Sequence, residues 1–294
     1  MDTRDFPVGV IGTGAMGGAV ARRLLACGFE THVRDIRPEA MRELELQGAH
    51  SHTSGASIGA SCKAIVVLVV DAPQMENALF GARGAAESLR SGTLIVLSST
   101  IAPPDAESFA RRLDTKGALV LDAPVSGGPH RAVNGEMSMM AAGSQRAWDV
   151  GQRVLPMLSS RLFHVSERAG DGARFKLVNN MLAGINLAAG GEAFALAERL
   201  GLDARKLQEV ISASSGASWV VADRLQRVLS GDDGVYAATR MLAKDLRLLT
   251  TVAEDAGFNV PLASEACERF QSFVRAGLSD ADDSVLIKRA REIK

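Results

Sequence analysis

A glycine-rich turn near the N-terminus constrains the fold of this chain more than any other feature. The apolar segment Val8–Ile11 runs into the sequence GTGAMG, and an alanine- and leucine-rich stretch follows up to Gly28. Strand, turn and helix in this order, with glycines spaced as GxGxxG, are typical of a dinucleotide-binding sheet. The start of the helix then offers free N–H groups to a pyrophosphate. The predicted cofactor contacts in this turn are Gly12, Thr13, Gly14, Ala15, Met16 and Gly17.

An acidic residue follows the turn at the distance that decides between NAD and NADP. Asp35 ends a second predicted strand, Thr31–Arg34, and such an acid is expected about 20 residues after the glycines. A carboxylate there binds the adenine-ribose hydroxyls and repels a 2′-phosphate, so NAD is the predicted cofactor. Arg34 and Arg37 favour the alternative, NADP, and a further alternative is that Asp35 only caps the next helix.

Strands and helices continue to alternate as far as residue 165. Ala64–Val70 is a continuous run of branched apolar residues, and Thr93–Leu97 is a further strand after an intervening helix. The pattern predicts a Rossmann-type α/β fold, a doubly wound parallel sheet that binds ligands beyond the carboxyl ends of its strands. Val70, Asp71 and Thr100 stand at such ends and are predicted cofactor contacts, although Thr100 also suits a helix cap.

Beyond Val165 the pattern is helical to the end of the chain. We therefore predict two domains: residues 1–165 form a cofactor-binding Rossmann domain, and residues 166–294 form an all-helical domain. A long helix near Ala173–Leu200 contains no proline and many small residues, which predicts close packing against another helix, of this chain or of a second subunit. Further helices are expected near residues 204–212, 218–230, 240–256, 261–276 and 283–293.

Three polar segments are candidates for chemistry, each with a plainer alternative. Lys176 and Asn180 are four residues apart and share one helical face. They could be a catalytic base and an amide that orients the substrate, or they could belong to a solvated first turn. The pair Lys244–Asp245 interrupts an apolar helix, as part of a site or as a solvated face. The third segment comprises Ser126, Gly127 and Gly128, with His130 close by. It could offer a hydroxyl and exposed N–H groups to a carboxylate, or it could be an ordinary turn.

Composition argues against several other classes of protein. The chain has 33 Lys and Arg residues against 34 Asp and Glu residues, so no basic excess favours nucleic acid or a membrane surface. The three cysteines and five histidines show no metal-ligand spacing, which predicts neither a metal site nor disulfides. No signal sequence and no apolar run of membrane-spanning length is evident, so we expect a soluble cytoplasmic protein.

Four motifs in order, GTGAMG, DAPVSGG, GDGARFKLVNN and KDL, resemble those of the β-hydroxyacid dehydrogenase family over the whole chain. That family includes 3-hydroxyisobutyrate dehydrogenases and tartronate semialdehyde reductases. The resemblance implies a fold like that of 6-phosphogluconate dehydrogenase, a small carboxylate substrate and a homo-oligomer, either a dimer or a tetramer, with substrate and dimer contacts in the helical domain. It implies that Lys176 is catalytic, that Asn180 contacts the substrate and that Ser126, Gly127 and Gly128 hold its carboxylate, with Lys244 and Thr100 beside the cofactor.

Within the family, two segments look most like L-threonate dehydrogenases, which oxidise a four-carbon sugar acid to its 2-oxo form. These segments are Asp282–Lys288 and Ser214–Trp219. The implied chemistry is deprotonation of a hydroxyl by Lys176 while a hydride passes to nicotinamide. Because a free lysine has a pKa of about 10.4, a lysine base needs burial or a nearby cation to bring it to roughly 7–8. Ser166–Ala169 departs from the family pattern, in which glycine is usual.

Four alternatives remain open at this point. Within the family, the chain could be a 3-hydroxyisobutyrate dehydrogenase or could reduce 2-hydroxy-3-oxopropionate, which is tartronate semialdehyde. Imine reductases share the fold but usually lack the lysine found at Lys176. A non-catalytic reader module on the same fold is the fourth alternative, and the presence of Lys176 together with the lack of a basic tail counts against it.

Overall fold

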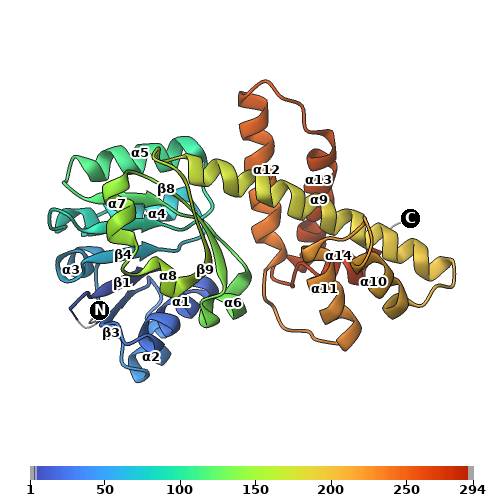
Figure 1. The fold of residues 1–294 in the computed structure, drawn as a ribbon, viewed down its shortest axis with the longest axis horizontal. Coiled ribbons are helices and arrows are strands. Elements are labelled where there is room, and N and C mark those ends of the chain that lie inside the picture. Colours follow the sequence, from blue (N-terminus) through green and yellow to red (C-terminus); the bar gives the residue numbers. More distant parts are fainter. Residues whose placement is uncertain (1–2, 4, 291–294) are drawn as a thin grey trace. The chain divides into compact units, whose positions relative to one another are not determined.

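The chain divides into two compact units between Lys176 and Leu177, and each is described by itself. The structure is a computed structural model that describes residues 3 and 5–290 (Figure 1). The sequence placed the border at residue 165, where the last strand ends. The division falls later because the first turns of the following helix pack with the N-terminal unit: Ala173 lies in the same apolar cluster as Ile95 and Leu97.

The N-terminal unit is the alternating α/β domain that the sequence predicts. Its strands are β1 (Val8–Ile11), β2 (Thr31–Arg34), β3 (His50–Ser51), β4 (Ala64–Val67), β5 (Leu94–Leu97), β6 (Leu119–Asp122), β7 (Val125–Ser126), β8 (Met137–Ala142) and β9 (Ser159–Ser166). Its helices are α1 (Ala15–Ala26), α2 (Glu39–Leu46), α3 (Gly55–Ser61), α4 (Ala72–Phe80), α5 (Pro103–Asp114), α6 (Gly128–Asn134), α7 (Gln145–Gly151) and α8 (Leu155–Leu158), with a 3₁₀ turn at Ala85–Glu87.

One sheet joins these strands in the order β3-β2-β1-β4-β5-β6-β8-β7, with β9 paired to β8. The first six strands are parallel, and the chain reverses its direction of travel across the sheet between β1 and β4, where a doubly wound sheet binds its ligand. The far edge differs from the prediction of a wholly parallel sheet, because β8 runs antiparallel to β6 and β7.

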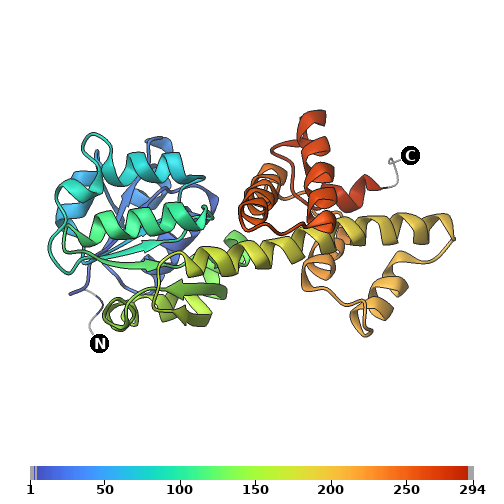
Figure 2. The same ribbon diagram turned by 90° about the horizontal axis from the view of Figure 1, so that it is seen from above.

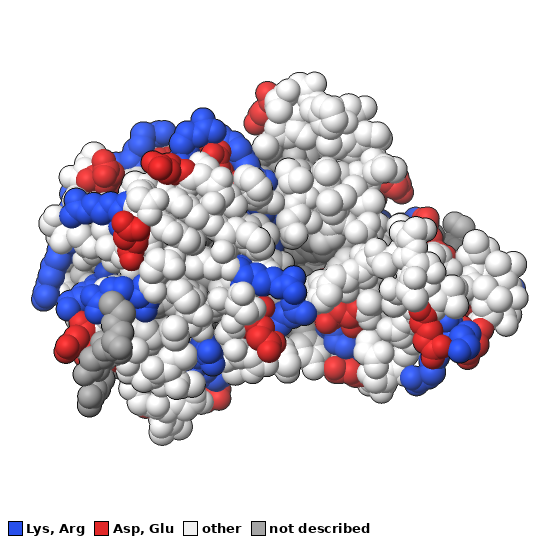
Figure 3. All heavy atoms as spheres, viewed as in Figure 1, with Lys and Arg blue, Asp and Glu red and all other residues white. Residues whose placement is uncertain are grey.

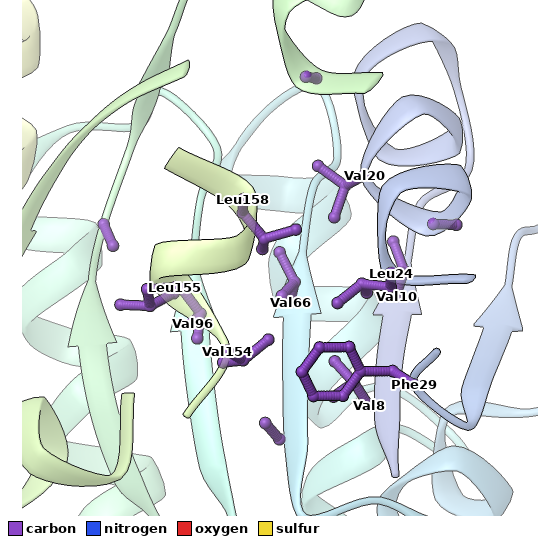
Figure 4. Packing of buried hydrophobic residues seen from close by; sticks show 14 of the residues in the cluster. Val8, Val10, Val20, Leu24, Phe29, Val66, Val96, Val154, Leu155 and Leu158 are labelled. Atoms are coloured by element: carbon purple, nitrogen blue, oxygen red, sulfur yellow. The ribbon is translucent and has the colours of Figure 1, made fainter. Parts of the chain in front are cut away.

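Apolar side chains cover both faces of this sheet. Val8 and Val10 of β1 and Val66 of β4 pack on one face, against α1 and α8, as Figure 4 shows. Ile65 of β4 and Leu97 of β5 face the opposite way, into a second cluster that includes α3, α4 and α5. Burial on both faces explains why these strands read as continuous apolar runs rather than as alternating ones.

The C-terminal unit consists of helices joined by loops, with an isolated antiparallel β-bridge between Ala238 and Asp282. It contains most of α9 (Asp171–Arg199), a single unbroken helix that begins in the N-terminal unit (Figure 2). The others are α10 (Ala204–Ser212), α11 (Trp219–Ser230), α12 (Thr239–Asp255), α13 (Pro261–Phe273) with a π-helical extension at Val274–Leu278, and α14 (Val285–Lys288). The last helix is shorter than predicted, and residues 291–293 of that prediction lie outside the described residues.

Small residues on α9 allow neighbouring helices of the same unit to approach closely, as the sequence predicts. A Cβ at Gly184 would lie 2.8 Å from Leu246 of α12, and one at Gly191 would lie 2.7 Å from the carbonyl oxygen of Leu286 in α14. A larger residue at Gly191 would therefore meet the backbone of α14, and one at Gly184 would displace the Leu246 side chain. The predicted close helix packing is therefore confirmed, and it occurs within one chain.

Charges of both signs are interspersed on the face of the molecule drawn in Figure 3, in keeping with the net charge of −1. Among the described residues, no helix is long and apolar enough to cross a bilayer. No group of three or more His, Cys, Asp and Glu side chains in the described part of the chain is arranged to hold a metal ion.

Candidate functional site

The glycine turn after β1 is shaped to admit a ligand at its open side. A Cβ at Gly17 would lie 1.7 Å from the carbonyl oxygen of Gly12, so α1 must begin in direct contact with the turn. At Gly14, by contrast, the nearest atom to an added Cβ is the Arg37 Nη2, 3.9 Å away. Gly14 is the N-cap of α1, and no side chain caps that end of the helix. The free N–H groups and the open space fit a dinucleotide pyrophosphate, as the motif predicts.

Asp35 is tied to this turn by its carboxylate. Oδ2 accepts hydrogen bonds from the Thr13 backbone N–H at 2.7 Å and from its hydroxyl at 3.3 Å, while Oδ1 accepts the Arg37 backbone N–H at 2.9 Å. Burial would raise the pKa of Asp35, but the two backbone N–H groups and the Arg37 charge hold it below its usual value. The side chain is therefore ionised at neutral pH. It does not cap α2, whose N-cap is Pro38.

The ends of β4 and β5 are joined by a hydrogen bond that the sequence did not reveal. The Val69 backbone N–H donates to the Ser99 hydroxyl at 3.0 Å. Beyond it, Val70 is 38% exposed, and Asp71 caps α4 by accepting the Gln74 N–H at 2.9 Å. Thr100 does not cap α5, whose N-cap is Ala102, so the capping alternative for Thr100 is wrong.

The predicted carboxylate-binding segment forms a sharp turn between β7 and α6. Ser126 ends β7, and Gly127 and Gly128 follow with φ angles of 134° and 75°, which favour glycine. Backbone N–H groups in such a turn are open to an anion. His130 is exposed on α6, and nothing in the structure gives it a role.

Asp122, the last residue of β6, anchors the start of α9. Its Oδ2 accepts the backbone N–H groups of Gly170 and Ala173, each at 2.9 Å. The side chain is 1% exposed, and its Oδ1 has no hydrogen-bond partner among the described residues. Burial raises the pKa of Asp122 to about 6, against the opposing effect of the two N–H donors. Sequence reasoning missed this residue, although an acid at the end of a buried strand was a visible signal.

Lys176 and Asn180 lie one turn apart on α9, and both are buried, each 7% exposed. Burial removes the solvated-turn alternative. In the C-terminal unit, the Asn180 amide donates to Asp245 Oδ2 at 2.7 Å, and Lys244 Nζ forms an ion pair with Asp245 Oδ1 at 2.9 Å. Asp245 thus joins two predicted site residues, and its own burial, at 7% exposure, removes the solvated-face alternative for that pair.

Comparisons with known protein families identify both parts of the chain. Residues 7–166 match the NAD binding domain of 6-phosphogluconate dehydrogenase. Residues 170–290 match the family described as NAD-binding of NADP-dependent 3-hydroxyisobutyrate dehydrogenase. The two matches together span nearly the whole chain and meet between β9 and α9.

Individual relatives agree with these matches over almost their full lengths. An L-threonate dehydrogenase of Cupriavidus necator is 40% identical over 96% of this chain and 95% of its own. The mitochondrial 3-hydroxyisobutyrate dehydrogenase of Homo sapiens is 31% identical over 97% of this chain and 87% of its own. A crystal structure of 3-hydroxyisobutyrate dehydrogenase from Salmonella typhimurium has a TM-score of 0.87 at 37% identity, covering 97% of this chain and 99% of that one.

Proposed function

We propose that this chain, which belongs to the β-hydroxyacid dehydrogenase family, oxidises L-threonate to its 2-oxo acid with NAD and with Lys176 as the proton-transfer group. It is an oxidoreductase that acts on a hydroxyl group of a small hydroxy acid. The observation that carries the proposal is the buried pair Lys176 and Asn180 on one face of α9. L-threonate is the best-supported substrate because the relative of 40% identity bears that name.

Each side chain has a definite part in the proposed reaction. The turn at Ser126, Gly127 and Gly128 holds the substrate carboxylate through N–H groups and a hydroxyl. Lys176 accepts the proton of the reacting hydroxyl, and burial helps because an amine deprived of water is less stable as the charged ammonium. Asn180, held by Asp245, orients a substrate hydroxyl. NAD, when bound, would supply the hydride acceptor.

Replacing the lysine tests the proton-transfer role. We expect Lys176→Ala to lower kcat by roughly 10²–10⁴-fold, the range that general acid–base groups contribute, while NAD still binds. Lys176→Arg keeps a cation but cannot release its proton near neutral pH, so it should be equally inactive. Steady-state kinetics and NAD binding by fluorescence titration measure both effects.

The matched control is Lys63→Ala. Lys63 is an exposed lysine of the same unit whose side chain donates to the Asp5 carbonyl oxygen, and its loss should leave kcat unchanged. Turnover in Lys176→Ala or Lys176→Arg close to that of Lys63→Ala would refute the proposed role.

A substrate panel tests the reaction itself. L-threonate, 3-hydroxyisobutyrate, glycerate and serine should be assayed with NAD and with NADP in parallel. We expect the highest kcat/KM for L-threonate with NAD. A clear preference for 3-hydroxyisobutyrate would favour the second candidate, which the likeness to the Salmonella typhimurium structure supports.

The preference for NAD is supported by the ionised carboxylate of Asp35, whose charge repels a 2′-phosphate. The guanidinium of Arg37, with its Nε 3.5 Å from Asp35 Oδ1, offsets part of that charge. Arg37→Ala should therefore raise the ratio of kcat/KM for NAD to that for NADP. An unchanged or lower ratio would contradict the proposed contribution of these two charges.

We also propose a homo-oligomer. Phe175, Val178 and Leu182 are each 54% exposed on α9, and apolar side chains so placed favour burial against another chain. Light scattering coupled to gel filtration gives the mass directly. A monomeric mass at micromolar concentration would refute this part of the proposal.

A further inference from the structure

We infer that Asp122 is a positioning residue for Lys176: its carboxylate clamps the first turn of α9 to the end of β6 and so sets where the lysine lies. This inference rests on the proposed function only for the role of Lys176. The contact itself lies within the N-terminal unit and joins residues that are far apart in the sequence.

The clamp acts on the backbone that immediately precedes the lysine. Asp122 Oδ2 accepts the N–H of Gly170, just before α9, and of Ala173, inside its first turn. A Cβ at Gly172 would lie 2.3 Å from the Asp122 carbonyl oxygen and 2.6 Å from that of Met140, so the turn rests directly on β6 and β8. Lys176 follows Ala173 by less than one helical turn, and a helix transmits such a constraint rigidly.

Burying the Asp122 carboxylate costs desolvation free energy, which a solvent-exposed helix cap does not. Asp122 is almost fully buried, and no cationic side chain hydrogen-bonds to it among the described residues. The nearby charges are those of Arg174, which favours the ionised form, and Asp171, which opposes it. Both belong to a network: Arg174 contacts Glu107 of α5 and Asp171, which also contacts Arg168.

Ionisation strengthens the clamp. Hydrogen bonds from N–H groups to a charged carboxylate are roughly twice as strong as those to a neutral oxygen. Because burial raises the pKa of Asp122 to about 6, protonation loosens these bonds at mildly acidic pH. The lysine should then be held less firmly, and kcat should fall as the pH drops through about 6.

Two variants at this position test the inference. Asp122→Asn keeps an oxygen for both N–H groups but removes the charge, so kcat should fall by up to roughly 10²-fold, the cost of a small misplacement. Its kcat should also lose the part of the fall near pH 6 that Asp122 contributes, while the fall caused by protonation of Lys176 itself remains. Asp122→Ala removes the acceptor and should speed hydrogen exchange at the amides of Gly170 and Ala173, measured by mass spectrometry or NMR.

The matched control is Asp203→Asn, which alters an exposed aspartate that caps α10 by accepting the Lys206 N–H. It should change neither kcat nor exchange at Gly170 and Ala173. Wild-type kcat together with a pH profile identical to that of wild type in Asp122→Asn would overturn the inference, as would unaltered exchange in Asp122→Ala. If Asp122→Ala does not fold, the kinetics of Asp122→Asn decide.

The exchange measurement separates this inference from the proposed function. Exchange at Gly170 and Ala173 reports the clamp whether or not Lys176 transfers a proton. Normal turnover in Lys176→Ala refutes the role of the lysine and leaves the clamp standing. Unaltered exchange in Asp122→Ala refutes the clamp and leaves the role of the lysine standing.

Discussion

Buried carboxylates in the two units of this protein hold different kinds of partner. In the N-terminal unit, Asp122 accepts two backbone N–H groups on one oxygen and leaves its other oxygen without a described partner. In the C-terminal unit, Asp283 binds the guanidinium of Arg224 with both oxygens, at 2.8 and 3.0 Å. Both aspartates are at most 2% exposed.

Burial raises the pKa of both groups, but the compensation differs. The Arg224 charge neutralises Asp283, so this pair holds α11 to the segment before α14 and belongs to the packing of the helical unit. The charge of Asp122 is stabilised by two backbone N–H dipoles and by the charge of Arg174, and no cationic side chain hydrogen-bonds to it among the described residues. The comparison shows two ways to hold a buried carboxylate: Asp283 is compensated by a cation within the helical unit, whereas Asp122 is held mainly by backbone N–H groups at the start of α9.

The largest expected effect comes from breaking the pair in the C-terminal unit. Asp283→Ala leaves the Arg224 guanidinium, whose side chain is only 13% exposed, buried without its main partner. We expect the free energy of unfolding to fall by about 3–5 kcal/mol. Urea unfolding followed by circular dichroism measures the change.

The control for this prediction is Asp233→Ala, which removes an ion pair with Lys288 in which the aspartate side chain is 90% exposed. Exposed pairs contribute about 0–1 kcal/mol. If Asp283→Ala lowers the free energy of unfolding no more than Asp233→Ala does, the buried pair of Asp283 and Arg224 does not stabilise the helical unit as described.

The second effect is the contribution of Asp122 to the pH dependence of the free energy of unfolding. The folded pKa of about 6 lies above the ordinary 3.8, so the folded state binds the proton more tightly than the unfolded state does. The resulting stability is complete below about pH 4 and is lost as the pH rises through about 6. At about 1.4 kcal/mol for each pKa unit, wild type should lose about 3 kcal/mol relative to Asp122→Asn over this interval.

Thermal or urea unfolding of both proteins at a series of pH values tests the prediction. The sign matters more than the absolute stability, because the NH2 group of the Asn would take the position of Oδ1, which has no described partner, and would itself lack an acceptor there. Parallel pH profiles for wild type and Asp122→Asn would show that Asp122 does not titrate in this range.

The smallest of the three effects concerns Asp35, whose pKa is lowered rather than raised. Its stabilising contribution is present above the ordinary pKa of 3.8 and is lost as the pH falls below it, the opposite direction to Asp122. Asp35→Asn should cost about 1–3 kcal/mol at pH 7, since one amide cannot accept both the Thr13 and the Arg37 N–H groups.

The same variant should raise the KM for NAD, because the Thr13 N–H belongs to the glycine turn. Arg34→Gln, a change at the adjacent residue of β2, is the control for stability. Unchanged stability and unchanged KM in Asp35→Asn would show that the hydrogen bonds between Asp35 and the glycine turn contribute neither to stability nor to NAD binding.

Much of the fold could be predicted from local patterns in the sequence. The glycine turn, the buried runs at β1, β4 and β5, and the limits of α10 were all predictable, because backbone geometry and burial on two faces act over a few residues. Two local interpretations did not hold. The helix expected near residues 283–293 is limited to α14 (Val285–Lys288) among the described residues, and the capping alternative for Thr100 is wrong because Ala102 is the N-cap of α5.

The candidate site was predictable where one motif supplied all its parts and not where distant segments meet. Lys176 and Asn180 share a helix, so their spacing alone places them on one face. Asp122 and Asp245 act on partners 48 to 65 residues away, and nothing in the neighbourhood of either residue specifies that contact.

The amino-acid order by itself determined the family and the alternation of strands and helices, and it supplied the residues that we propose for the chemistry. Periodicity, turn geometry and residue chemistry are short-range properties, and a linear pattern records them directly. The strand order with its antiparallel edge, the burial of Lys176 and the ionisation of Asp35 and Asp122 required the folded chain. Solvation and hydrogen-bond donors depend on segments brought together from afar, and these set whether a buried acid is charged.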